Sequence, residues 1–385
     1  MVNRARSCFS ARGVAPILAL CIAVIACGCA GARSAGFGAT GAPAVLSDRG
    51  PAIRAEAWPE ADAMFRRDPD WLGGDGAFSI DLGGDRTLWL FGDSLIATTE
   101  ARVRRESEIV RNSIAIQTGR DPSTASVQFY WRSNADGSPA SFFPEQGDVW
   151  LWPAHGVCVD NHLTIFLYRM VADLSPESFG FRAVGWTAVR VEQPDADPLA
   201  WKIRELATPD TSATGIVGAA VIHEGDHLNA YVVREPGNHD IMVLRWRESE
   251  FKAGDLGSPE WWGGPERGWG SHAPAVVMRD GQTEFSVSRI RAPPHLVLVQ
   301  SRGFGASNLA LRFAPRLTGP WTRLHDAYRP PEVDRPELLL YAGKAHPQLE
   351  GADLVATYVS NTSDPDVVIS DDTIYFPRFV RITFR

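Results

Sequence analysis

Short stretches of alternating hydrophobic and polar residues recur along this chain, separated by Gly, Pro, Asp and Asn. A period of two is typical of a half-buried strand. In one such region five apolar residues fall on even positions: Phe78, Ile80, Leu82, Leu88 and Leu90. Gly83-Gly84-Asp85 between them is a natural tight-turn sequence. We therefore predict a β-hairpin formed by Ala77–Leu82 and Thr87–Gly92.

The same pattern repeats in irregular units of roughly four strands each, and convincing amphipathic helices are nearly absent. Repeated four-stranded antiparallel units are the signature of a β-propeller. We predict an all-β fold, a five-bladed β-propeller of four-stranded antiparallel blades. The fourth blade is expected to begin with Ala273–Arg279 and the fifth with His346–Leu349. The last segment is expected to pair with a strand from the N-terminal part. A two-sheet sandwich is the competing architecture.

The N-terminus predicts export. Arg4, Arg6 and Arg12 lie before or at the start of an apolar run that is too short to span a membrane. We interpret residues 1–29 as a signal peptide of the lipoprotein type, because the residues before Cys29 and Cys27 resemble a lipobox. Cys29 is our first choice for lipidation and Cys27 the second; an ordinary signal peptide is the alternative. Residues 30–50 predict a flexible tether rich in Gly, Ala and Ser, and residues 51–385 the propeller.

Composition narrows the function classes. The formal net charge is −8 and the sequence contains no run of basic residues, so we expect no nucleic-acid partner. Cys158 is the only cysteine after Cys29, which excludes an intramolecular disulfide and a cysteine-based metal site in the exported part. We expect a monomer without cofactor or catalytic metal. Thirteen tryptophans offer flat faces for sugar rings, although a hydrophobic core accounts for most of them.

Two aspartates lie at the open end of the predicted hairpin. Asp75 precedes the turn by nine residues and Asp93 follows it by nine, so they are expected to face each other. Opposed residues have Cβ atoms about 5 Å apart, which is costly for two carboxylates unless they have a use. Mutual repulsion would keep one of them protonated near neutral pH, as in glycoside hydrolysis. The alternative is that both accept backbone hydrogen bonds in glycine-rich loops.

Several motifs resemble known propellers. The segment Leu317–Trp321 resembles a turn of five-bladed glycosidases of the family 43 type. Trp89–Ser94, Arg111–Ser113 and Lys344–Pro347 resemble more closely a group of secreted bacterial domains of unknown function that includes endo-D-arabinanases. This resemblance implies a glycoside hydrolase, with an arabinan-type furanoside as the expected substrate. It also implies a rival general acid in the third blade, Glu235.

Other polar residues are candidates for substrate binding. They share predicted positions near blade openings: Asn112, Trp152, His155, His272, Lys344 and His346. Weaker candidates are Asp70, as a third acid, and Tyr358, Asn361 and Arg378. Structural roles are the alternative for each, and His346 is also a candidate neighbour of a structural Ca²⁺.

The sequence thus predicts an exported glycoside hydrolase that acts on a polysaccharide or oligosaccharide, with Asp75 and Asp93 as its acids. The membrane would be a partner through the lipid anchor, placing the protein in the cell envelope; a secreted form is the alternative. A carbohydrate-binding or surface-scaffold propeller without catalysis is the competing function.

Overall fold

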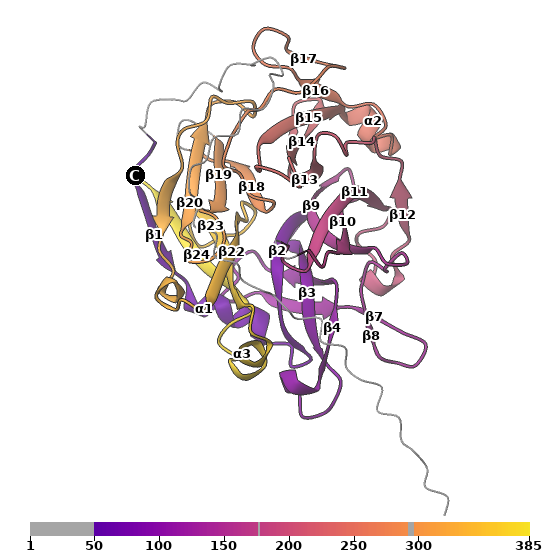
Figure 1. The fold of residues 1–385 in the computed structure, drawn as a ribbon, viewed down its shortest axis with the longest axis vertical. Helices are drawn as coiled ribbons and strands as arrows, with labels where there is room; N and C mark the ends of the chain where they lie inside the picture. Colours follow the sequence, from indigo (N-terminus) through magenta and orange to yellow (C-terminus); the bar gives the residue numbers. More distant parts are fainter. Residues whose placement is uncertain (1–49, 176–177, 292–295) are drawn as a thin grey trace, which may run out of the picture.

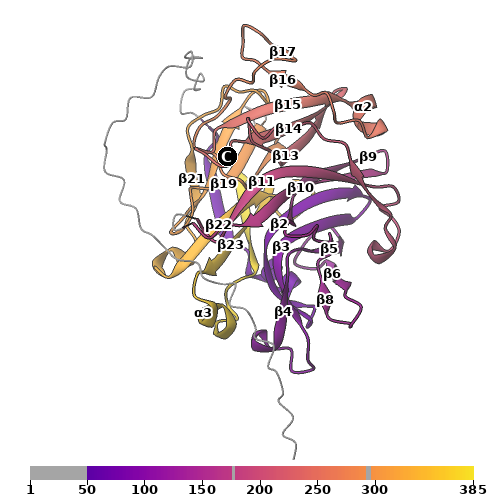
Figure 2. The same ribbon diagram turned by 45° about the vertical axis from the view of Figure 1, so that its right-hand side comes forward.

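The protein is a five-bladed β-propeller with short connecting helices. The computed structural model describes residues 50–175, 178–291 and 296–385. Figure 1 looks down on the ring of antiparallel sheets, and Figure 2 shows the blades turned by 45°. Each blade is one antiparallel sheet, and its first strand contacts the first strand of the next blade around the centre. These innermost strands are β2, β9, β13, β18 and β22.

Blades 1 and 2 are formed by residues 71–206. Blade 1 contains β2 (Trp71–Gly83), β3 (Arg86–Ala97), β5 (Ser113–Thr118) and β6 (Ser126–Tyr130), with β4 (Ser107–Val110) paired to β3. Blade 2 contains β9 (Trp150–Val159), β10 (His162–Ala172), β11 (Phe181–Val191) and β12 (Ile203–Leu206). A small hairpin of β7 (Arg132–Ser133) and β8 (Pro139–Ala140) lies between the two blades in sequence.

Blades 3 to 5 complete the ring. Blade 3 contains β13 (Ile216–Glu224), β14 (His227–Val233), β15 (Ile241–Arg247), β16 (Glu260–Trp262) and β17 (Trp269–Gly270). Blade 4 contains β18 (Phe285–Arg289), β19 (Leu296–Ser301), β20 (Leu309–Ala314) and β21 (His325–Tyr328). Blade 5 contains β22 (Leu338–Ala345), β23 (Leu354–Thr362), β24 (Pro377–Phe384) and β1 (Ile53–Ala57). The α-helices are short: α1 (Pro59–Asp62), α2 (Glu248–Ala253) and α3 (Pro365–Ser370).

The ring closes through its two ends, as the sequence predicts. Ile53 pairs with Phe384 and Ala57 with Val380, so β1 forms the outer strand of the last blade. Figure 1 shows the C-terminus beside β1. The buried hydrophobic residues form four clusters between neighbouring blades. The blades bury their hydrophobic side chains against one another, which explains how a chain with 44% hydrophobic residues can fold with so little helix.

Two predicted strands are wrong. Ala273–Arg279 is a connection without regular strand structure, apart from one bridge between Met278 and Ile241, because the chain must cross there from the outer edge of blade 3 to the centre. Blade 5 begins with β22 and not with His346–Leu349, which follows that strand.

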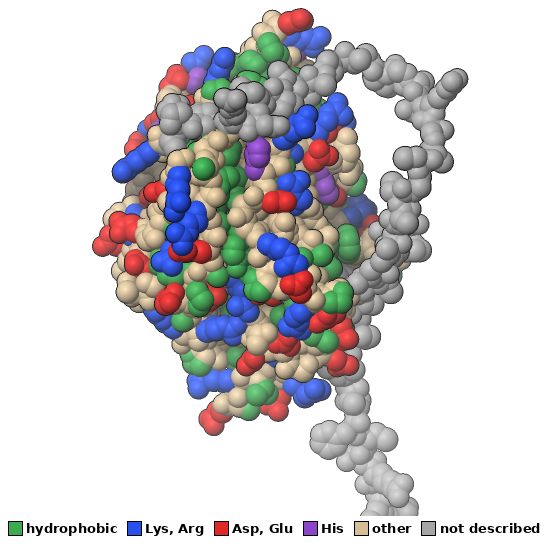
Figure 3. All heavy atoms as spheres, turned by 90° about the vertical axis from the view of Figure 1, so that its left-hand side faces the viewer, with side chains coloured by type: hydrophobic (Ala, Val, Ile, Leu, Met, Phe, Trp, Pro, Cys, Tyr) green, Lys and Arg blue, Asp and Glu red, His purple; other side chains and the backbone are tan. Residues whose placement is uncertain are grey.

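The surface is mixed in charge. Figure 3 shows acidic and basic side chains interspersed over the face it presents. No helix of the described residues is long and apolar enough to cross a bilayer. The predicted signal peptide, tether and lipidation cysteines, Cys27 and Cys29, lie outside the described residues.

Candidate active site

Asp75 and Asp93 lie together in the β2–β3 hairpin, at the end of the ring where the innermost strands begin; we call this end the mouth. The tight turn is confirmed at Gly84-Asp85, since Gly83 pairs with Arg86. The direct opposition is wrong, because the register shifts between the pairs Gly74–Ser94 and Gly76–Phe91. Asp75 is therefore the single residue of β2 opposite Gly92 and Asp93, which form a β-bulge on β3. A bulge re-aims a side chain, which is typical of functional sites.

The carboxyl group of Asp75 is half-buried and faces the last blade. Its Oδ2 accepts a hydrogen bond of 2.7 Å from the hydroxyl of Tyr341, which in turn accepts one of 3.2 Å from the amide of Asn361. Burial, followed by the charges of Asp93 and Glu284, raises the pKa of Asp75 to about 8. Asp75 is therefore protonated at neutral pH and can donate a proton.

Asp93 has a different environment. Its Oδ2 accepts from the guanidinium of Arg111 at 3.1 Å, and its Oδ1 accepts from Nε1 of Trp152 at 2.9 Å. Burial raises the pKa of Asp93, whereas Arg111 and Trp152 oppose that rise. The backbone carbonyl of Asp93 accepts a hydrogen bond of 2.8 Å from the hydroxyl of Tyr375. Two donors on its carboxylate favour the ionised form of this residue.

Lys344 is buried beside Asp75. Its side chain is 1% exposed, and its Nζ donates to the carbonyls of Gly76 and Ala342. The same Nζ lies 3.0 Å from Oε1 of Glu284, a carboxylate at the start of blade 4. Lys344 thus fixes the backbone beside Asp75, which is a positioning role, and it is too buried to contact a polysaccharide.

His155 and His346 lie deeper along the innermost strands. Nδ1 of His155 accepts from the backbone N–H of Val221 at 2.9 Å, so its Nε2 donates to the carbonyl of Ser79 at 3.2 Å. Burial lowers the pKa of His155 to about 4, and the ring is neutral. His346 is fully buried between the hydroxyls of Ser79 and Thr357, at 2.6 and 2.8 Å. All four ring nitrogens have hydrogen-bond partners within the protein, so we assign both histidines a structural role.

Asn112 is also structural. It is fully buried, and its amide donates to the carbonyls of Phe143 and Leu151 at 3.0 and 2.8 Å. Its Oδ1 accepts from the backbone N–H of Phe143 at 2.7 Å. The expectation that Asn112 binds sugar is wrong, because every polar atom of its side chain is used to tie blade 1 to blade 2.

Two further candidates lie away from the aspartates. Glu235 follows β14 in a mouth loop and pairs with His239 at 2.7 Å rather than with an arginine. His272 packs against Gly263 and Gly270 of the β16–β17 hairpin, at the outer edge of blade 3. The expected placement of His272 at the mouth is therefore wrong, because the chain has not yet crossed to the centre at that point.

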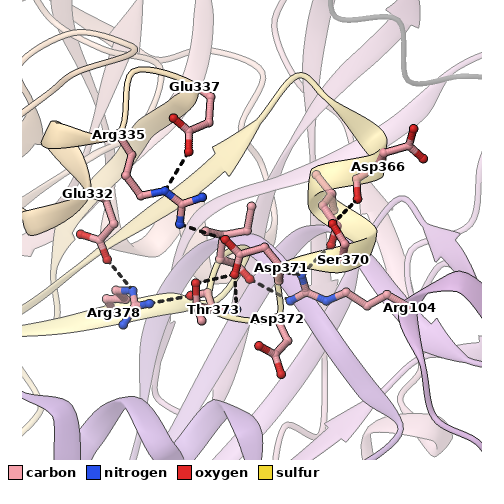
Figure 4. Close-up of polar contacts among 12 residues, drawn as sticks. Arg104, Glu332, Arg335, Glu337, Asp366, Ser370, Asp371, Asp372, Thr373 and Arg378 are labelled. Carbon is pink, nitrogen blue, oxygen red and sulfur yellow. Dashed lines mark hydrogen bonds and ion pairs between the residues drawn. The ribbon is translucent and has the colours of Figure 1, made fainter.

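The weaker candidates have structural partners. Asp70 is exposed and pairs with Arg102 at 2.7 Å. Tyr358 donates to Glu332 at 2.9 Å, and Arg378 binds the same carboxylate at 2.8 Å. Figure 4 shows Arg378 binding Glu332 among the loops of blade 5.

The sequence did not indicate four residues of the site: Arg111, Glu284, Tyr341 and Tyr375. Arg111 could have been identified, since it precedes Asn112 in the motif Arg111–Ser113. The two tyrosines come from blade 5, more than 260 residues from the aspartates. No local pattern marks such a partner.

The described residues contain no group of three or more His, Cys, Asp or Glu arranged to hold a metal ion. What the mouth does offer is one carboxyl group whose pKa is raised to about 8 beside a second one that accepts from an arginine and an indole. That combination suits general acid catalysis together with nucleophilic or base catalysis.

A family model described as Domain of unknown function (DUF5005) matches residues 60–384. The chain belongs to this family. The match runs from α1 to β24 and thus covers the propeller apart from β1. The narrower resemblance to the endo-D-arabinanase-containing group is not established by it. No curated protein matches the chain.

Solved structures share the fold. A protein of Bacteroides ovatus ATCC 8483, provisionally described as a hydrolase, superimposes with a TM-score of 0.68 at 18% identity, covering 86% of this chain and 90% of its own. The catalytic domain of the Coprinopsis cinerea GH62 α-L-arabinofuranosidase gives a TM-score of 0.43 at 11% identity, covering 82% of this chain and 91% of its own. The superposition on the Bacteroides ovatus protein shows that the two chains have a similar fold.

Proposed function

We propose that this protein is a glycoside hydrolase that acts on a polysaccharide, with an arabinan-type furanoside as the substrate class. The observation that carries the proposal is the pair at the mouth, in which Asp75 is held protonated beside Asp93. Asp75 is the general acid and Asp93 the nucleophile or base. Support for a glycan comes from Trp152, whose partly exposed indole borders Asp93, and from the arabinofuranosidase named among the similar folds.

The roles follow from the two environments. A general acid must carry its proton at the working pH, and burial of Asp75 together with neighbouring negative charge ensures this. Its partner must be ionised, and Arg111 with Trp152 stabilises that form of Asp93. Glu284 and Lys344 form an ion pair near Asp75, and their charges shift its pKa in opposite directions. Glu235, tied to His239, is the weaker choice for the acid.

The test compares wild type with Asp75→Asn and Asp93→Asn on arabinan and a panel of other polysaccharides. Both variants should lower reducing-end release by about 10²–10⁴-fold. Asp70→Asn is the matched control, because Asp70 is an exposed aspartate paired with Arg102. Release that survives both substitutions contradicts the assignment. Binding without release by wild type would favour a carbohydrate-binding scaffold. The anomer released, read by NMR, tells whether Asp93 acts as nucleophile or as base.

We also propose that the protein is exported and anchored by a lipid on Cys29, with Cys27 as the second candidate. Support comes from the charged and apolar N-terminal sequence. Membrane fractionation of Cys29→Ala and Cys27→Ala tests it, since only the variant that lacks the lipidated cysteine should leave the membrane.

A further inference from the structure

A second polar cavity lies on the mouth side between blades 3 and 4. Its volume is about 580 Å³, within the size range of small-molecule sites. The lining residues that matter here are His239, Gln282, Gln300, Arg302, Arg312 and Arg323. They come from the loop before β15, the connection into β18, the end of β19 and the outer half of blade 4.

The cavity is basic in a protein of net charge −8. Three arginines line it, whereas Asp280 is its one acidic residue. Arg302 pairs with Asp326. In the part of the chain that the structure describes, neither Arg312 nor Arg323 forms an ion pair with a carboxylate. Burial lowers the pKa of Arg312, which shows that its charge is poorly compensated.

Two polar atoms around the cavity have no partner. Gln300 is 1% exposed, and its amide donates to the carbonyl of Asp280 at 3.0 Å, but its Oε1 accepts nothing. Nε of Arg312 is buried and donates to nothing. A buried polar group without a partner costs about 1–3 kcal/mol, so the wall of the cavity carries uncompensated polarity. A ligand that suits this wall offers a negative acceptor to the arginines.

In the sequence, residues of the cavity lie close to Glu284 of the aspartate site. The connection that passes through it at Asp280–Gln282 reaches Glu284 two residues later. His239, on the opposite wall, holds Glu235 at 2.7 Å. One extended saccharide could therefore contact both places.

We propose that this cavity binds an acidic sugar unit, through its carboxylate or sulfate ester, in a glycan whose neighbouring part lies at the mouth. The anionic group accepts from the exposed guanidinium of Arg323 and is attracted by the charge of Arg312. This inference rests on the proposed function in that the ligand is a saccharide; the binding itself does not require catalysis.

Calorimetry with the full folded chain tests the proposal. The probes are trigalacturonate, its fully methyl-esterified neutral form, a sulfated trisaccharide and inorganic sulfate. Trigalacturonate or the sulfated trisaccharide should bind at least tenfold more tightly than the neutral ester, and which of the two does so identifies the anionic group. Equal binding of charged and neutral forms overturns the proposal, as does inorganic sulfate binding as tightly as the sugars.

Arg323→Gln should weaken binding of the acidic sugar by about tenfold, as expected for one charged hydrogen bond. Arg323 is exposed, so this variant should keep its fold. Arg316→Gln is the matched control, because Arg316 is an exposed arginine of the same blade outside the cavity. Unchanged affinity in Arg323→Gln overturns the proposal.

The two proposals can fail separately. Acidic sugar binding without cleavage of any polysaccharide would leave this cavity assigned and refute the hydrolase. Cleavage that Asp75→Asn abolishes, together with no preference for acidic sugars, would support the hydrolase and refute the acidic-sugar site.

Discussion

At the scale of single residues, the site depends on one carboxyl group that the fold keeps uncharged. Asp75 is surrounded by blade 5 and by two other acids, and its pKa rises to about 8. Tyr341 and Lys344 partly offset this cost. Groups whose pKa is strongly shifted by burial and by a specific charge cluster at functional sites.

Asp75→Asn should therefore stabilise the protein at neutral and alkaline pH. The folded-state pKa lies above the unfolded value, so the cost of keeping Asp75 protonated grows from about pH 4 and levels off above about pH 8. The gain should be on the order of 2–4 kcal/mol at pH 7 and absent below pH 4. Urea unfolding of both proteins across this pH range measures it. A gain that does not change with pH would contradict the shifted pKa.

The rate of hydrolysis should fall as pH rises through about 8, because Asp75 then loses the proton that it donates. Initial rates from pH 5 to 10 measure this alkaline limb. A rate that is constant up to pH 10 would show that another group is the acid.

Gly92 should resist substitution for a steric reason. A Cβ atom at this position would collide with Oδ1 of Asp75. Gly92→Ala is expected to displace that carboxyl group and lower kcat by about tenfold or more, since small misplacements in a site are costly. Steady-state kinetics measure this, and Gly84→Ala, in the open turn of the same hairpin, is the control. Unchanged kcat in Gly92→Ala would show that the Asp75 carboxyl group tolerates displacement.

At the scale of elements, the loop after α3 brings blade 5 to the site, and one arginine holds that loop. The buried guanidinium of Arg104 donates to the carbonyls of Leu72, Val368, Asp371 and Ile374 at 2.8–2.9 Å. Figure 4 shows Arg104 reaching the turn at Asp371, with Arg335 binding Asp371 from the other side. Tyr375, which bonds to Asp93, follows directly.

Arg104→Gln should destabilise the protein by about 2–4 kcal/mol, because four buried carbonyls lose their donor. Denaturant unfolding measures the loss. The neighbouring exposed Arg105, changed to Gln, should have an effect within about 0.5 kcal/mol. Equal effects of the two substitutions would show that the carbonyl contacts of Arg104 contribute little.

At the scale of the whole molecule, the ring depends on the pairing of its two ends. β1 adds the outer strand to blade 5 over five residue pairs, from Ile53–Phe384 to Ala57–Val380. A propeller is held by such closure because an open ring leaves an unpaired sheet edge.

A chain that begins at Trp58 should lose about 3 kcal/mol or more of stability compared with one that begins at Gly50. The loss reflects the whole β1 ladder, from Ile53–Phe384 to Ala57–Val380. Thermal unfolding of the two truncated chains beside the complete chain measures this. Equal melting temperatures of the two truncated chains would contradict closure by β1.

The sequence by itself determined the blade pattern, the tight turn at Gly84 and the presence of two aspartates in one hairpin. These are local features, because alternation and turn residues report on neighbours along the chain. It missed β22, where Ala342 has a left-handed φ of 58° and Lys344 occupies a buried position, both contrary to a strand pattern.

Only the tertiary structure decided what surrounds the aspartates. Tyr341 and Tyr375 reach them through closure of the ring, and the bulge at Gly92-Asp93 arises from the register of β2 on β3. The packing of the blades also occupies the polar atoms of Asn112, His155 and His346 within the protein. A side chain's pKa and its hydrogen-bond partners depend on what is packed against it, and in a ring those neighbours come from distant parts of the chain.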